Sequence, residues 1–158
     1  ARVAVSFALP ARALPDAAER CAVSWAGRGP GPAYPDTGAA ARYGWSAASV
    51  ADLQERTVRP QEAGRRDAVR WARLADRLEV TAEAGGGLTV RPWSTEHLAA
   101  TDHDHLLRPD GRVHVVLDLA CSGVGTAACG PGVLPRYRLP AQEVGGSLRF
   151  RTVPREAS

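Results

Sequence analysis

Apolar and polar residues alternate in several short runs of this chain, with the period of strands that bury one face. In residues 2–9 (RVAVSFAL), Val3, Val5, Phe7 and Leu9 fall on one side. The same period predicts strands at 21–25 (CAVSW), 67–76 (DAVRWARLAD), 113–121 (VHVVLDLAC) and 147–153 (SLRFRTV). The alanine and arginine content of 67–76 leaves a helix open there. The chain is therefore predicted to be mostly β.

Turn and cap residues divide these runs. Gly85-Gly86-Gly87 predicts a hairpin turn between RLEVTAEA and GLTVRPW. STEHLAAT, opening at Ser94, fits a short helix, and ASVADLQ fits one or two helical turns opening at Ser49. Short strands separated by glycine and proline turns favour a sandwich of antiparallel sheets.

The segment 25–36, WAGRGPGPAYPD, contains three glycines and three prolines. It begins at Trp25, ends at Asp36 and has Tyr34 near its end. The strand before them is expected to end where this segment begins. Proline fixes φ and glycine permits turns that other residues resist. With Trp25 and Tyr34 anchored in apolar surroundings, the segment is predicted to be a rigid corner.

Composition narrows the function further. The 158 residues, 44% apolar and 23% charged, fit a single globular domain, 1–158. All 20 basic residues are arginines interleaved with 17 acids, and the densest cluster, Arg65-Arg66, is followed by Asp67. No nucleic-acid partner is therefore predicted, and no apolar run is long enough for a membrane span. The absence of a signal peptide and of any CxxC pair predicts reduced cysteines and a cytoplasmic location.

Candidate chemistry is sparse. His103 and His105 would share a face of a strand as a weak metal pair, but no third ligand accompanies them, so a polar turn is favoured and no metal site is predicted. Gly123 and Gly125 imitate a phosphate loop, but the prolines that follow exclude its helix. No acidic pair is singled out for acid/base work. The residues taken alone give no complete active site.

Four longer segments, taken together, carry more information: 25–53, 58–74, 93–107 and 118–139. In order and spacing they resemble the C-terminal domain of the LacZ-type β-galactosidases of glycoside hydrolase family 2. That family's pattern Trp-x-Gly-x-Gly-Pro-x-Glu-x-Tyr-x-Asp is matched, with Pro32 in place of Glu, by Trp25, Gly27, Gly29, Pro30, Tyr34 and Asp36.

A second motif of the family, Pro-Gln-Glu-Asn-Gly-Asn, is matched by Pro60, Gln61, Glu62 and Gly64. Ala63 and Arg65 replace its two asparagines. The loss of both amides is expected to remove polar groups that could hydrogen-bond loops or sugar.

The resemblance implies an all-β fold: a β-supersandwich of twisted antiparallel sheets, like that of galactose mutarotase, with one or two short helical turns. It implies a fragment of the C-terminal domain of a longer enzyme that hydrolyses terminal β-D-galactose from β-galactosides such as lactose, with retention. The chain itself would be non-catalytic, because the family's two catalytic glutamates lie in a central barrel. A stand-alone or small-subunit carbohydrate-binding module is the alternative.

The resemblance also implies where this domain would meet sugar. In the family, one loop reaches the active site with a tryptophan, and alignment places Ala128, Cys129 and Gly130 at that position. Magnesium and sodium would be held by the parent's barrel, with no cofactor in this chain. The implied partners are a β-galactoside and the catalytic barrel domain or a large subunit, and the resemblance leaves room for a homo-oligomeric parent.

Overall fold

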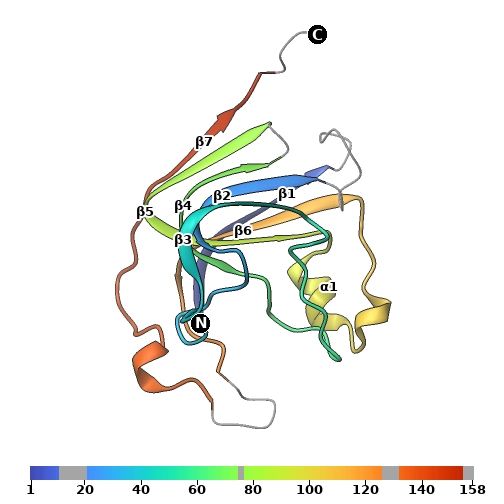
Figure 1. The fold of residues 1–158 in the computed structure, drawn as a ribbon. Helices are drawn as coiled ribbons and strands as arrows, with labels where there is room; N and C mark the ends of the chain where they lie inside the picture. The colour runs from blue at the N-terminus through green and yellow to red at the C-terminus, as the bar shows by residue number, and fades with distance from the viewer. Residues whose placement is uncertain (11–20, 75–76, 126–131, 155–158) are drawn as a thin grey trace.

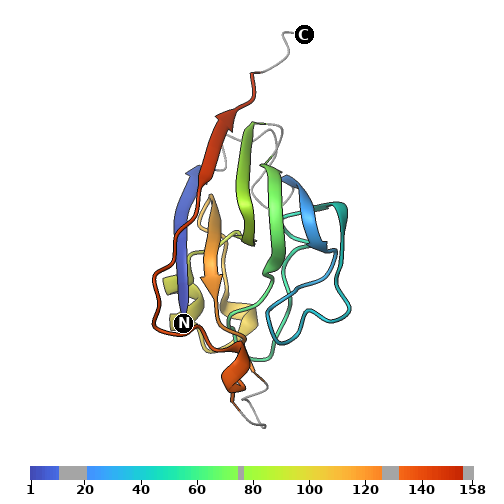
Figure 2. The same cartoon turned by 90° about the vertical axis from the view of Figure 1, so that its left-hand side faces the viewer.

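The computed structural model describes residues 1–10, 21–74, 77–125 and 132–154. The described strands form one seven-stranded antiparallel sheet in the order β1-β6-β5-β4-β2-β3, with β7 pairing with β5. Figures 1 and 2 show the sheet twisted and curled. Its strands are β1 (Arg2–Pro10), β2 (Ala22–Gly29), β3 (Arg42–Ser49), β4 (Arg66–Leu74), β5 (Leu78–Arg91), β6 (Arg112–Cys121) and β7 (Leu148–Thr152). The all-β prediction is confirmed.

Curling brings strands from distant parts of the sheet into one hydrophobic core. Val23 and Trp25 on β2 meet Val113 and Val115 on β6 in the same buried cluster. Each is at most 1% exposed. Burial of a side chain of this size contributes roughly 1.5–3 kcal/mol, so these alternating residues hold the curl closed.

The predicted hairpin at Gly85-Gly86-Gly87 is wrong. These glycines lie inside β5, a continuous strand of 14 residues. Gly85 has a φ of +74°, and the register between β4 and β5 shifts around Val69, as expected at a bulge. A Cβ on Gly86 would lie 2.5 Å from the carbonyl oxygen of Asp118. The glycines therefore bend β5 and admit a close neighbour. The β4–β5 ladder instead begins at the pair Leu74 and Leu78, and the N–H of Arg77 donates to the carbonyl of Leu74 at 3.0 Å.

Helical structure is short, as predicted. α1 (Thr95–Ala100) begins after Ser94, whose hydroxyl accepts a hydrogen bond from the backbone N–H of His97. Two 3₁₀ turns, η3 (Asp104–Leu106) and η4 (Pro135–Tyr137), follow. α1 and η3 fill the connection between β5 and β6 (Figure 1). Among the described residues, no helix has the length and apolar character needed to cross a membrane.

β2 runs further than the sequence predicts, since it continues through Gly27 to Gly29. Gly27 permits this because β4 lies against it: a Cβ there would be 2.8 Å from Cγ2 and 2.9 Å from Cα of Val69. Its partner across the ladder is Gly44 on β3, where an added Cβ would meet nothing within 4 Å. Packing against β4 therefore requires a glycine at position 27, whereas no neighbour requires one at position 44.

We expect Gly27→Ala to lower the free energy of unfolding by roughly 1–3 kcal/mol, because the methyl group would push against the backbone of β4. Gly44→Ala is the matched control and should be neutral or slightly stabilising, since alanine restricts the unfolded chain. Urea unfolding of the two variants measures the difference. Equal stabilities would contradict the close approach of β2 and β4.

Candidate functional site

The carboxylate of Asp36 joins the proline-rich segment to the glycine-rich loop that follows β6. Its Oδ1 accepts a hydrogen bond from the backbone N–H of Val124 at 3.0 Å, and its Oδ2 accepts one from that of Gly125 at 2.6 Å. A Cβ at Gly123 would lie 2.4 Å from Cγ of Asp36. Gly125 has a φ of +70°. We call this contact between Asp36 and residues 123–125 the Asp36 clamp.

The segment that carries Asp36 is itself fixed. The N–H of Ala33 donates to the carbonyl of Arg65 at 2.7 Å, and the N–H groups of Thr37 and Gly38 donate to the carbonyl of Tyr34. Arg28 on β2 donates to the carbonyl of Gly38 at 2.5 Å. The part after β2 is therefore a hydrogen-bonded corner, whereas residues 25–29 belong to the strand; the rigidity of the corner stays a prediction.

The loop side of the clamp is anchored as well. The N–H of Ser122 donates to the carbonyl of Ala1, and the N–H of Gly123 donates to that of Tyr137, both at 2.8 Å. The hydroxyl of Ser122 accepts from the N–H of Leu139 at 2.9 Å. Residues 122–125 are thus held by backbone groups of Ala1 and of the segment 137–139, and by the carboxylate of Asp36.

Behind the clamp lies a network of charged side chains. Glu62 accepts hydrogen bonds from Arg2 at 2.7 Å, Arg91 at 2.9 Å and the hydroxyl of Tyr34 at 2.9 Å. Arg2 also pairs with Asp118 on β6 at 2.9 Å. A guanidinium on the edge strand β1 therefore links the loop that carries Glu62 to the neighbouring strand β6.

Asp118 and Arg65 form the deepest part of this network. Nε of Arg65 lies 2.6 Å from Oδ2 of Asp118, and their side chains are 5% and 0% exposed. Arg65 also donates to the carbonyl of Ala33 at 2.9 Å and pairs with Asp67 at 2.9 Å. The expectation that replacing the family's asparagines removes loop hydrogen bonds is wrong at this position, because Arg65 supplies one.

The pKa values reflect these surroundings. Burial by itself would raise the pKa of Glu62, but the charges and hydrogen bonds of Arg91 and Arg2 outweigh it, so the pKa is lowered. Burial raises the pKa of Asp118, and the charges of Arg2 and Arg65 offset only part of that rise. Burial, with the nearby Glu62 charge, also raises the pKa of Tyr34 and keeps its hydroxyl a donor.

Comparison with known proteins places this geometry in a family. A family model described as the β-galactosidase small chain matches residues 2–151. The chain belongs to the β-galactosidase small chain family. The chain is 33% identical over 137 residues to a β-galactosidase of Arthrobacter sp. (strain B7) and 29% identical over 143 residues to one of Staphylococcus xylosus. These alignments cover 81% and 89% of this chain and 14% of each relative.

A third relative, a β-galactosidase of Kluyveromyces lactis, is 33% identical over 129 residues, which are 75% of this chain and 12% of that protein. The chain thus corresponds to one part of each of these much longer β-galactosidases. The resemblance drawn from the four sequence segments is confirmed.

Membership gives the family motifs a structural meaning. Trp25 and Tyr34 of the first motif are 1% and 4% exposed, and Asp36 of the same motif forms the clamp. Glu62 of the second motif binds Arg2, Arg91 and Tyr34. The sequence placed Glu62 in a family motif, but no local pattern gave a signal for the roles of Arg2 and Asp118. The basic cluster Arg65-Arg66 is buried, with 4% and 6% exposure.

The predicted sugar-site residues Ala128, Cys129 and Gly130 fall outside the described residues, so their role stays a prediction. His103 and His105 do not lie on a strand: His103 precedes η3 and His105 lies within it, with the two rings stacked 5.6 Å apart. In the described part of the chain, no three His, Cys, Asp or Glu side chains gather as a metal site. Cys21 is buried and its thiol donates to the carbonyl of Ala22, while Cys121 is half-buried and its thiol donates to the carbonyl of Ser122.

Asp118→Asn should lower the free energy of unfolding by about 3–5 kcal/mol, because the buried guanidinium of Arg65 loses its buried charged partner and keeps only the more exposed Asp67. Asp102→Asn is the control. Asp102 pairs with Arg59 at the surface, where their side chains are 73% and 76% exposed. Its loss should cost under about 1 kcal/mol. Similar midpoints for both variants in chemical denaturation would contradict the importance of the buried pair.

Asp36→Asn should release the loop locally. The amide keeps one acceptor but turns N–H donors toward backbone N–H groups, and hydrogen bonds to a charged acceptor contribute roughly 1.5–3 kcal/mol. Hydrogen exchange at Val124 and Gly125 should therefore accelerate about tenfold or more. Asp52→Asn is the control, since Asp52 is exposed and bonds only locally to Ser49. Unchanged exchange in Asp36→Asn would contradict the clamp.

Proposed function

We propose that this chain is a non-catalytic part of a β-galactosidase that hydrolyses terminal β-D-galactose from β-galactosides such as lactose. Its role is to support the catalytic barrel and to hold one loop at the sugar site. The observation that carries the proposal is the Asp36 clamp. It fixes residues 123–125, which lead directly into the segment where the family places its sugar-contacting loop.

The environments of Glu62 and Asp118 favour a catalytic centre in another part of the enzyme. A retaining glycosidase needs one carboxylate as nucleophile and a second as acid and base, both in reach of the same sugar. Glu62 and Asp118 are the two acids that share Arg2, but both are engaged by guanidinium groups and the Asp118 side chain is 0% exposed. Neither is placed to attack a sugar or to donate a proton to one.

The remaining parts of the enzyme follow from the same proposal. The two glutamates, together with magnesium and sodium, would lie in the barrel, which would be supplied by the same polypeptide or by a large subunit. The described residues of this chain offer no three-ligand group for a divalent ion. A cytoplasmic location and a homo-oligomeric parent belong to this proposal as well.

The activity test compares the purified chain with the complete protein that carries it. The chain alone should not hydrolyse a chromogenic β-galactoside, whereas the complete protein should. In the complete protein, Asp36→Asn should lower kcat/KM by roughly tenfold or more, because a small misplacement of a sugar-contacting loop is costly. Asp52→Asn should leave the rate unchanged.

Hydrolysis by the chain alone would overturn the non-catalytic role. A complete protein that is folded but inactive on every β-galactoside would favour the alternative, a carbohydrate-binding module without hydrolase activity. If Asp36→Asn leaves kcat/KM unchanged, the loop does not contribute to the sugar site. The chain would then only support the barrel.

A further inference from the structure

Three aromatic side chains lie on the outer face of the sheet, where β3, β2 and β4 run side by side. Tyr43 and Trp45 on the edge strand β3 are 58% and 75% exposed. Trp45 lies against Trp71 of β4, with ring centroids 5.1 Å apart and planes tilted by 60°. Ala26 of β2 pairs with both tryptophans in the ladder, and its small side chain lets the two indoles meet above it. We call Tyr43, Trp45 and Trp71 the aromatic surface.

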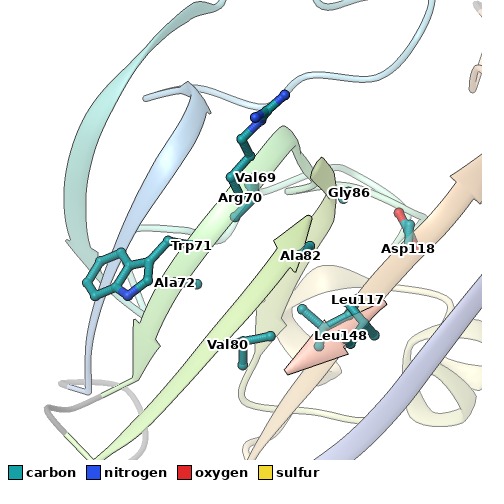
Figure 3. A pocket seen from close by; sticks show the side chains of 11 residues that line it. Val69, Arg70, Trp71, Ala72, Val80, Ala82, Gly86, Leu117, Asp118 and Leu148 are labelled. Atoms are coloured by element: carbon teal, nitrogen blue, oxygen red, sulfur yellow. The ribbon is translucent and has the colours of Figure 1, made fainter. Parts of the chain in front are cut away.

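Trp71 belongs to this face and not to the core. Figure 3 shows its indole directed away from Val80, Leu117 and Leu148, whose side chains gather on the other side of the strands. Ala72, the next residue, is 2% exposed and joins the core cluster. Strand alternation therefore places Trp71 outward, beside Trp45.

Charged side chains border the aromatic surface and hold it in place. The guanidinium of Arg73 lies 5.5 Å from the ring centroid of Trp71. Nε of Arg73 donates to Glu79 at 3.0 Å, and Nε of Arg151 donates to the other oxygen of Glu79 at 2.8 Å. A ladder of polar groups that can bond hydroxyls thus runs across β4, β5 and β7 beside the two indoles.

The composition of this face indicates what it binds. The other large apolar side chains that are exposed in the described residues lie elsewhere: Val3, Val5, Val58, Leu106, Leu134 and Phe150. Tyrosine, tryptophan and arginine are also enriched in protein interfaces, so the test below includes self-association among its outcomes. This surface joins flat rings directly to charged groups. A pyranose has the matching chemistry, with C–H groups on one face and hydroxyls around its rim.

We propose that Tyr43, Trp45 and Trp71 form a carbohydrate-binding surface that receives the C–H faces of pyranose rings in a galactose-containing oligosaccharide. The negative π face of each indole attracts the polarised C–H groups. The guanidinium groups of Arg73 and Arg151 bond the hydroxyls, and Glu79, whose side chain is 7% exposed, holds both of them in position. An open sheet face suits several linked sugars better than one enclosed ring. This site goes beyond the proposed function, because it uses none of the residues predicted to contact the sugar there and requires no catalytic partner.

The test is titration of the chain, and of the complete protein that carries it, with lactose and with a β-linked galacto-oligosaccharide. Tryptophan fluorescence and calorimetry should both report millimolar binding, tighter for the longer sugar. Trp45→Ala should weaken binding about tenfold or more, as expected when an aromatic contact is lost. Trp45→Phe should stay within a few-fold of the parent chain, since it keeps a ring.

Phe150→Ala is the matched control. It removes an exposed aromatic ring that packs edge-on against Phe7, away from the aromatic surface, and should leave sugar binding unchanged. Circular dichroism checks that each variant folds. Absence of binding to the parent chain, or equal binding by Trp45→Ala, overturns the proposal. So does self-association that Trp45→Ala abolishes in the absence of any sugar binding. None of these outcomes depends on hydrolysis, so they are separate from the test of the proposed function.

Discussion

The buried pairing of Asp118 with Arg65 and Arg2 is the contact on which most of this structure depends. A carboxylate that is 0% exposed is costly unless its charge is compensated nearby, and here two guanidiniums approach it at 2.6 and 2.9 Å. The pairing joins β6 to its neighbour β1 at one edge of the sheet, and to Arg65, which directly precedes β4 two strands away. Loss of Asp118, or of either arginine that pairs with it, would leave a charged group in the low-dielectric interior with less compensation.

Arg2 and Arg65 also connect the buried Asp118 to the segment that carries Asp36. Arg2 reaches from Asp118 to Glu62, and Glu62 accepts the hydroxyl of Tyr34. Arg65 holds the segment of Tyr34 a second time through the carbonyl of Ala33. That segment then presents Asp36 to the loop after β6. The clamp is therefore the surface end of a chain of contacts that begins in the core, and its geometry depends on buried charges as much as on proline.

The strands and the short helix were predictable because their signals are local. Alternation located β1, β6 and β7, although β6 buries the consecutive residues 115–118 and β1 has a bulge between Val3 and Ala4. Ser94 caps α1 through its own side chain. The site was predictable only in part. The family motifs pointed to Asp36 and Glu62, but the partners of these acids lie 88 and 60 residues away in sequence. No pattern within a window of a dozen residues contains such contacts. The burial of Arg65 and Arg66 was hidden for the same reason.

The error over the three glycines has its cause in the same buried pair. A glycine triplet between two alternating runs is a good hairpin signal when only local geometry is considered. In the folded chain, however, a Cβ at Gly87 would lie 2.3 Å from Nε of Arg65 and 2.4 Å from Oδ2 of Asp118. The ion pair occupies the space that a side chain of β5 would need. Gly87 is thus required by the contact between Arg65 and Asp118 that passes over β5, while Gly85 takes a positive φ and Gly86 admits the Asp118 carbonyl. The strand continues through them because its neighbours on both sides supply the ladder. Packing around a buried charge, not chain reversal, accounts for this stretch of the sequence.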